Sequence, residues 1–275
     1  MNFFNIIGQL AEVDADALDR LDSRRAVFSS MRTVAKRSAQ AALPVLLASY
    51  FQKAYAGTNA GDPKEVFNYA LKLEYLEADF YNKMIASPFF ATASGVDQAA
   101  IRQISKHETS HVKLLEAVIR GIGGTTDAPV AFKTTTFATL TSFAKQLEIA
   151  QLLEDTGVRA YKGRATDLQG IPDQNIPGIG MVSPLQAALQ IHSVEARHAA
   201  HIRGMRNQTA WISGNGDLDN FDNYKGATPE NNTKQAGYDL TKDLGKPYSA
   251  MDVAASFDEI LTVSETLALA GPLIQ

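Results

Sequence analysis

Two Glu-x-x-His motifs constrain this chain more than any other feature of its sequence. One runs from Glu108 to His111 and the other from Glu195 to His198, each well inside a segment with helical periodicity. A spacing of three residues places both side chains of a motif on the same face of a helix. The chain has five histidines and no cysteine, so a transition-metal site must be built from histidine, aspartate and glutamate.

Four long helical segments are predicted between residues 60 and 210, at about 62–86, 97–120, 136–162 and 183–208. Asp62-Pro63 and Ser183-Pro184 each combine an N-cap residue with a proline in the first helical turn. The same region contains no alternating pattern typical of a β-strand beyond a few residues, and 164–182 is expected to be a Gly/Pro-rich loop. Four helices of this length predict an all-α protein built around a four-helix bundle.

The two halves of the predicted bundle look like divergent copies of one another. Leu73-Glu74 is followed by Tyr81, and Leu153-Glu154 is followed by Tyr161 at the same distance. Aligning the halves pairs Glu74 with Glu154, Tyr81 with Tyr161, Glu108 with Glu195 and His111 with His198. The first glutamate and the Glu-x-x-His motif are 34 residues apart in one half and 41 in the other, and the additional residues fall in the Gly/Pro-rich loop.

This arrangement matches the ligand pattern of a carboxylate-bridged dinuclear metal site. Such a site takes one glutamate from each of two helices and one Glu-x-x-His motif from each of the other two. Four carboxylates offset much of the charge of two divalent ions, and the two imidazoles add one nitrogen ligand each. Oxygen and nitrogen ligands of this kind suit iron or manganese. Without metals or protons, four carboxylates in one bundle core would be strongly destabilising.

The sequence also resembles the ferritin-like superfamily, and within it the branch of desiccation-related ferritin-like proteins. The resemblance rests on residues 73–81, 107–112 and 194–200, together with 256–259 and 271–274 near the C-terminus. It implies a ferritin-like four-helix bundle with two iron or manganese ions. The ligands that it implies are Glu74, Glu108, His111, Glu154, Glu195 and His198. It further implies that the phenols of Tyr81 and Tyr161 lie next to these ligands.

Glu77 is a second candidate on the first helix. It lies three residues after Glu74 and shares its face, so it could replace or supplement that ligand. The internal repeat favours Glu74, because the counterpart of Glu77 in the other half is Gly157. We therefore expect Glu77 to lie beside the ligands or to act as an alternate one.

The other polar residues near the motifs receive weaker assignments. We expect His201 to lie next to the ligands or to be a partly buried polar histidine, and His192 to be similar. His107 precedes Glu108 and points about 100° away around the helix, which favours a polar surface contact. Glu148 and Asp155 are expected on solvent-facing sides of the third helix.

Residues 1–56 form a segment that reads as an N-terminal helical arm or an export signal. Arg24-Arg25 precede an uncharged stretch at 38–52, and Ala54-Tyr55-Ala56 follows as a cleavage-like site. The arginine pair resembles a twin-arginine signal, although Phe28 comes one place late and the apolar run starts far downstream. Export predicts a periplasmic or extracellular protein, whereas an uncleaved arm that packs on the bundle predicts a cytoplasmic one. Membrane contact is expected only through this arm, if it is not cleaved.

Residues 211–275 form a C-terminal extension after the bundle at 60–210. The stretch 213–248 is rich in Asn, Asp, Gly and Lys and is expected to be a long surface excursion. Residues 250–267 recover the apolar periodicity of a helix and are expected to form a fifth helix against the bundle.

Two functions are compatible with these features. The first is a di-iron or di-manganese oxidoreductase of ferroxidase, peroxidase or catalase type, reacting with dioxygen or hydrogen peroxide in oxidative or desiccation stress. The second is a non-enzymatic scaffold that self-associates and holds structural metals or none. The net charge of −4 provides no basic surface for nucleic acid. The sequence leaves open whether the protein is a homo-oligomer.

Overall fold

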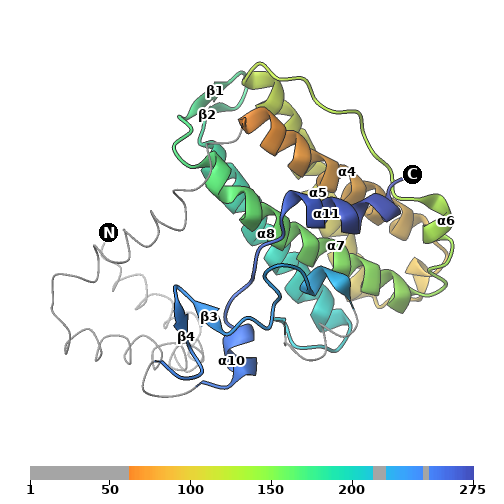
Figure 1. The fold of residues 1–275 in the computed structure, drawn as a ribbon. Helices are drawn as coiled ribbons and strands as arrows, with labels where there is room; N and C mark the ends of the chain where they lie inside the picture. Colours follow the sequence, from red (N-terminus) through yellow and green to blue (C-terminus); the bar gives the residue numbers. More distant parts are fainter. Residues whose placement is uncertain (1–61, 213–220, 244–247) are drawn as a thin grey trace, which may run out of the picture. The chain divides into compact units, whose positions relative to one another are not determined.

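The structure, a computed structural model, describes residues 62–212, 221–243 and 248–275. The N-terminal arm or export signal predicted at 1–56 lies outside the described residues. The described part of the chain is dominated by α-helix, with two short hairpins (Figure 1). Within these ranges, none of the helices combines the length and the apolar character needed to cross a membrane.

The core of the structure is a bundle of four long helices. They are α4 (Pro63–Ala86), α5 (Gly95–Gly121), α7 (Phe143–Arg164) and α8 (Pro184–Met205). Each begins at an N-cap residue whose side chain accepts a hydrogen bond from a backbone N–H of the first turn: Asp62, Ser94, Ser142 and Ser183. The predicted four-helix bundle is confirmed.

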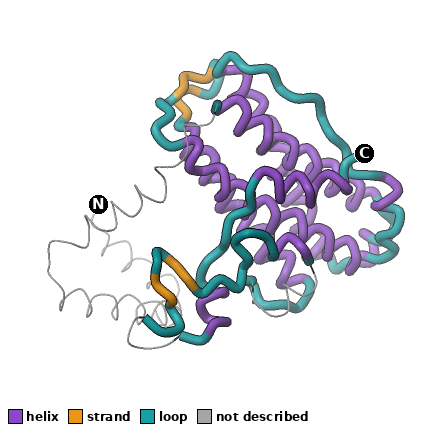
Figure 2. The backbone as a smooth tube through the Cα atoms, viewed as in Figure 1, coloured by secondary structure: helices purple, strands orange, loops and turns teal. Residues whose placement is uncertain are grey.

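A long crossover joins the two halves of the bundle. Helix α4 packs mainly on α5, α7 packs mainly on α8, and α4 also lies against α7. The connection from α5 runs back along α4, where the N–H of Asp127 donates to Asn68 at 2.8 Å and the N–H of Phe132 donates to Asp79 at 2.7 Å. Figures 1 and 2 show this segment passing along the bundle before α6 (Thr134–Phe137). Helices α5 and α7 therefore run in the same direction.

Two hydrophobic clusters fill the bundle on either side of a polar layer. On α4, one cluster includes Val66 and Phe67 near the start of the helix, and the other includes Phe80 and Met84 near its end. All four side chains are at most 3% exposed. Glu74, in the middle of α4, lies between these two ends of the helix. The clusters thus shield a charged layer from water on both sides.

The third predicted helix and the loop after it differ from the structure. The helix expected from 136 is divided into α6 and α7, because Ser142 caps a new helix whose first turn begins at Phe143. The expected loop at 164–182 contains a 3₁₀ turn at Ala165–Leu168 and an antiparallel hairpin of β1 (Gln174–Ile176) and β2 (Gly180–Val182). Gly178 closes this hairpin with a φ of 80°, a backbone conformation that glycine adopts without strain.

The predicted fifth helix at 250–267 is wrong. Two short helices, α10 (Ala250–Ala254) and α11 (Val263–Ala270), replace it. Ser249 and Thr262 each form a capping box, so the chain contains two helix starts in this stretch. The segment between them is held instead by α7, where the N–H of Leu261 donates to the carbonyl of Arg159 at 3.2 Å.

The polar stretch expected as a surface excursion is partly buried. It contains the hairpin of β3 (Lys234–Gln235) and β4 (Tyr238–Asp239), and residues 213–220 and 244–247 lie outside the described residues. Asn223, Tyr224 and Glu230 are each 0% exposed. This part of the extension therefore packs on the bundle through specific buried groups.

Candidate metal centre

Six side chains from all four long helices converge in the polar layer. Glu74 comes from α4, Glu154 from α7, and each Glu-x-x-His motif from one of the other two helices. The four glutamates are 0% exposed, and the two histidines are 8% and 5% exposed. The i, i+3 spacing of each motif on α5 and α8 brings its two side chains to the same side. The structure therefore brings together all six residues that the sequence singles out: Glu74, Glu108, His111, Glu154, Glu195 and His198.

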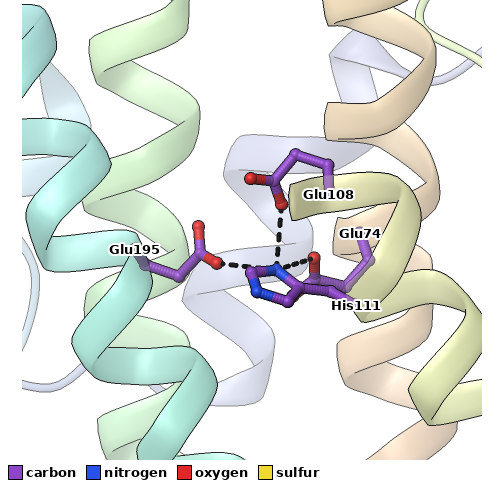
Figure 3. A group of neighbouring side chains, drawn as sticks. All are labelled: Glu74, Glu108, His111 and Glu195. Atoms are coloured by element: carbon purple, nitrogen blue, oxygen red, sulfur yellow. Dashed lines mark hydrogen bonds and ion pairs between the residues drawn. The ribbon is translucent and has the colours of Figure 1, made fainter. Parts of the chain in front are cut away.

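The first half of the site surrounds one nitrogen of His111. Its Nδ1 lies 3.1 Å from Oε2 of Glu74, 3.2 Å from Oε2 of Glu108 and 3.1 Å from Oε1 of Glu195 (Figure 3). A ring nitrogen carries one hydrogen or one lone pair, so it can form a good hydrogen bond with only one of these oxygens. A cation bound by this nitrogen and by the three carboxylates would account for their close approach.

The second half repeats this arrangement around His198. Its Nδ1 lies 2.9 Å from Oε1 of Glu108 and 3.1 Å from Oε2 of Glu154. Oε2 of Glu195 is more distant, at 4.0 Å. Glu108 and Glu195 therefore contact both imidazoles, one oxygen on each side, whereas Glu74 and Glu154 each contact one. Glu108 and Glu195 could therefore be shared by two ions, whereas Glu74 and Glu154 could each bind one.

Several oxygens in this layer lack a hydrogen-bond partner among the described residues. They are both carboxylate oxygens of Glu195 and Oε1 of Glu108. The nearby imidazole nitrogens are within ion-pair distance but outside hydrogen-bond geometry for these oxygens. A buried, unpaired carboxylate costs several kcal/mol by order of magnitude, which cations between the carboxylates would offset. The donor set of carboxylate oxygens and imidazole nitrogens fits divalent iron or manganese.

The carboxylates respond to burial in different ways. Burial raises the pKa of Glu74 to about 7 against the opposing effect of His111. Burial and the neighbouring Glu108 raise the pKa of Glu195 well above its ordinary value. Glu108 differs because the adjacent imidazoles of His111 and His198 outweigh burial and lower its pKa to about 2. Glu108, between the two imidazoles, therefore stays charged, while Glu195 retains its proton.

The imidazoles are affected in the opposite direction. Burial alone would lower the pKa of His198, but Glu154 and Glu108 raise it to about 10. The pKa of His111 is also raised, because Glu108, Glu195 and Glu74 outweigh burial. With protons as the only cations, the layer thus holds several of them. A divalent ion would have to displace these protons, so its affinity should increase with pH.

Two tyrosines hold the carboxylates of Glu74 and Glu154 from the opposite helix. The hydroxyl of Tyr161 on α7 donates to Oε1 of Glu74 on α4 at 2.5 Å, and that of Tyr81 on α4 donates to Oε1 of Glu154 on α7. Burial raises the pKa of both phenols well above the ordinary value, so they remain neutral donors. Each phenol leaves the second oxygen of its carboxylate facing an imidazole, and the phenols lie next to the candidate ligands, as the family resemblance implies.

Glu77 lies beside the six residues without joining either cluster. It is 2% exposed, and burial followed by the charge of Glu195 raises its pKa well above its ordinary value. A Cβ at Gly157 would lie 3.4 Å from Oε1 of Glu77 and 3.5 Å from Oε2 of Glu195. A Cβ here would thus make ordinary van der Waals contacts with both carboxyl groups, so Gly157 lies directly against Glu77 and Glu195. The clusters around the imidazoles contain Glu74 and not Glu77.

His107 stays outside both clusters of candidate ligands, as expected, but its contacts are not confined to the surface. Its Nδ1 lies 2.9 Å from Nε2 of His198, and its ring is half-buried between α5 and α8. The direction 100° away from Glu108 faces helix α8 instead of solvent. The scarcity of histidine in the chain was the available signal for this residue.

Three other assignments can be compared with the structure. His201 is exposed, which contradicts its expected partial burial, because the helix turns it outward. Half-buried His192 shares a hydrogen bond with the carbonyl of Val158 at 2.9 Å. Asp155 was expected to face solvent but is 3% exposed, because it pairs with Arg203 at 2.5 Å. Glu148 is exposed as predicted.

The raised pKa values predict how the stability of the metal-stripped protein depends on pH. A carboxyl group whose pKa is raised by folding stabilises the protein below its unfolded pKa and loses that contribution as pH rises through the folded pKa. For Glu74 this window extends from its ordinary 4.5 to about 7. The raised histidine pKa values act in the same direction. Thermal unfolding after treatment with a chelator should therefore show a midpoint roughly 5–10 °C lower at pH 8 than at pH 5.

Metal-loaded protein provides the control for this experiment. Because bound cations replace the protons, the midpoint difference between loaded and stripped protein should widen as pH rises. A stripped protein that is equally stable at pH 5 and pH 8 would contradict the argument.

Comparison with known families gives one result. Residues 62–208 match the family model of the ferritin-like domain, which covers more than half of the chain and all four long helices. Comparison with curated proteins gives no match.

Proposed function

Because the chain belongs to the ferritin-like domain family, we propose that it is a carboxylate-bridged dinuclear metal protein that reacts with dioxygen or hydrogen peroxide. The observation that carries this proposal is the pair of imidazole nitrogens, each surrounded by carboxylate oxygens, with Glu108 and Glu195 common to both. The buried oxygens without hydrogen-bond partners support it.

The residues divide into two overlapping ligand sets. One consists of Glu74, Glu108, His111 and Glu195, and the other of Glu108, Glu154, Glu195 and His198. Each set contains one imidazole and three carboxylates. We propose that the bound ions are iron or manganese, since both accept this mixture of ligands.

Bound iron or manganese would supply redox chemistry toward dioxygen or peroxide. The protein holds the carboxylates in place through the phenols of Tyr81 and Tyr161. The hydrophobic clusters at both ends of the polar layer exclude water from it. The carboxyl group of Glu77 keeps a proton next to Glu195, because its pKa is raised by burial. The biological setting that we propose is protection against oxidative or desiccation stress, which rests on the sequence resemblance.

Elemental analysis of the purified protein tests this proposal directly. After expression with iron and manganese supplied, we expect about two ions per wild-type chain. The double variant Glu108→Ala/His198→Ala should retain none, because it removes one bridging carboxylate and one imidazole. Glu148→Ala, at an exposed glutamate of α7, is the matched control and should bind as the wild type does.

Two outcomes have different consequences. A well-folded wild-type protein that binds neither metal would contradict the dinuclear site. A protein that binds two ions but consumes no peroxide and oxidises no ferrous iron would retain the site and favour the scaffold function, with structural metals.

A further inference from the structure

The two imidazoles of the site differ on the side that faces away from the carboxylates. Nε2 of His198 shares a hydrogen bond with Nδ1 of His107 at 2.9 Å. In the described part of the chain, nothing forms a hydrogen bond with Nε2 of His111. Both histidines therefore direct Nδ1 toward the carboxylates, but among the residues that the structure describes only His198 has a hydrogen-bond partner for its outer nitrogen, Nε2.

The geometry of the two rings shows a directed contact. The rings of His107 and His198 are inclined by only 9°, and their centres are 5.2 Å apart. The two nitrogens are much closer together than the centres, so the rings meet edge to edge through these atoms. Nδ1 of His198 faces the carboxylates, which leaves Nε2 as the nitrogen that carries a hydrogen. Nδ1 of a neutral His107 can accept that hydrogen.

The side-chain amide of the exposed Gln103, one turn earlier on α5, lies beside the other ring nitrogen of His107, with its nitrogen 2.7 Å from Nε2. Because Nδ1 of a neutral His107 accepts from His198, Nε2 carries the hydrogen and can only donate, so a hydrogen bond here would need the amide oxygen of Gln103 in place of its nitrogen. The contact that orients His198 is therefore the one between Nε2 of His198 and Nδ1 of His107.

The internal repeat relates this difference to a single aligned position. Aligning Glu108 with Glu195 pairs His107 with Val194 and Gln103 with Gln190. The glutamine is therefore present in both halves, but the residue that would join it to the imidazole is histidine in one half and valine in the other. A valine side chain has no group that can hydrogen-bond to His111.

We infer that His107 is a positioning residue for His198 and makes the two metal positions unequal, with the one at His198 binding its ion more tightly. This inference rests on the proposed dinuclear site. A hydrogen bond to the outer nitrogen of a histidine ligand fixes the tautomer with the inner nitrogen free, orients the ring and increases its basicity. Removing such a partner typically weakens metal binding by about 10- to 100-fold.

Titration of the full, chelator-stripped chain with Mn²⁺, followed by calorimetry, tests the inference. Wild-type protein should bind two ions in two steps. His107→Val, which introduces the residue of the repeat-related position, should weaken the tighter step by about 10- to 100-fold and leave the weaker step unchanged. His107→Asn should restore much of the loss, because its amide can take the place of Nδ1.

Two further variants assign the steps to the two halves. His198→Ala should remove the tighter step, and adding His107→Val to that background should have no additional effect. Val194→His should tighten the weaker step, because it supplies the partner that His111 lacks. Circular dichroism confirms that each variant is folded before titration.

The outcomes separate this inference from the proposed function. Two ions bound with unchanged affinities in His107→Val would overturn the role of His107 and leave the dinuclear site intact. Equal weakening of both steps would also overturn it, because a general effect on packing would then explain the result. No Mn²⁺ binding by folded wild-type protein would contradict the dinuclear site itself.

Discussion

Replacing Glu195 with glutamine is expected to abolish binding of both metal ions and at the same time to stabilise the metal-stripped protein. Glu195 reaches both imidazoles, so its loss affects both ligand sets. Its two carboxylate oxygens are buried without hydrogen-bond partners in the described part of the chain, and burial raises its pKa well above the ordinary value. A neutral amide of the same shape avoids that penalty. Metal binding and stability should therefore change in opposite directions.

The size of the stabilisation should depend on pH. Near pH 4.5 the carboxyl group is largely protonated in the folded protein, so the substitution changes little. At pH 8 the folded wild-type protein must either bury a charged carboxylate or keep this group protonated, although it is ionised in the unfolded chain. Keeping it protonated costs about 1.4 kcal/mol of folding free energy for each pH unit above the ordinary pKa. We expect Glu195→Gln to increase the free energy of unfolding by about 2 kcal/mol or more at pH 8.

Denaturant unfolding of chelator-stripped protein at both pH values, together with metal analysis, measures this effect. Glu148→Gln is the control, because Glu148 is exposed on α7 and should leave stability within about 0.5 kcal/mol. A destabilised Glu195→Gln protein would contradict this expectation, because it would mean that other groups of the protein already offset the cost of burying the Glu195 carboxylate without metal. A variant that still binds two ions would remove Glu195 from both ligand sets.

The ends of the helices could be predicted where the signals are local. Asp62-Pro63 and Ser183-Pro184 mark helix starts, and the structure begins α4 and α8 at those prolines. The third helix was predicted to begin too early, because its apolar residues continue across Ser142, which is in fact the cap. When the apolar pattern continues across a capping residue, the sequence does not reveal that the chain leaves one helix before this residue and starts another after it.

Residues of the site were predictable to the extent that they lie on repeated helix faces. Spacing alone groups the two Glu-x-x-His motifs and the two tyrosines, and the structure brings these together. Asp155 and His107 could not be placed in this way. Their partners Arg203 and His198 come from helix α8, and only packing of the helices determines which face of α5 or α7 meets it. Helical periodicity predicts the direction of a side chain but not what lies in that direction.

Arg159→Met is expected to destabilise the protein by about 3–5 kcal/mol and to release the C-terminal extension from α7. The guanidinium group of Arg159 is 0% exposed and lies 2.8 Å from Oε1 of Glu230. It also donates hydrogen bonds to backbone carbonyls of the extension, at residues 223, 225, 228, 259 and 260. Methionine would leave these carbonyls and a buried carboxylate without their donor, which is the costly way to break a buried ion pair.

Denaturant unfolding and limited proteolysis of the variant test this role. Cleavage should concentrate after residue 221, while residues 62–205 remain protected. The exposed Arg120 pairs with Glu116 on α5, so Arg120→Met is the matched control and should have an effect within about 0.5 kcal/mol. Adding Glu230→Gln to Arg159→Met should recover part of the loss, because it removes the unpaired charge.

The metal content of Arg159→Met separates the extension from the dinuclear site. Arg159 is five residues after Glu154, which places it roughly 140° around α7 and away from the ligands. A folded variant should therefore still bind about two ions while its extension is cut. Loss of the metals together with the extension would mean instead that the contacts of α7 with the extension hold Glu154 in place. The C-terminal residues would then be part of what maintains the metal centre.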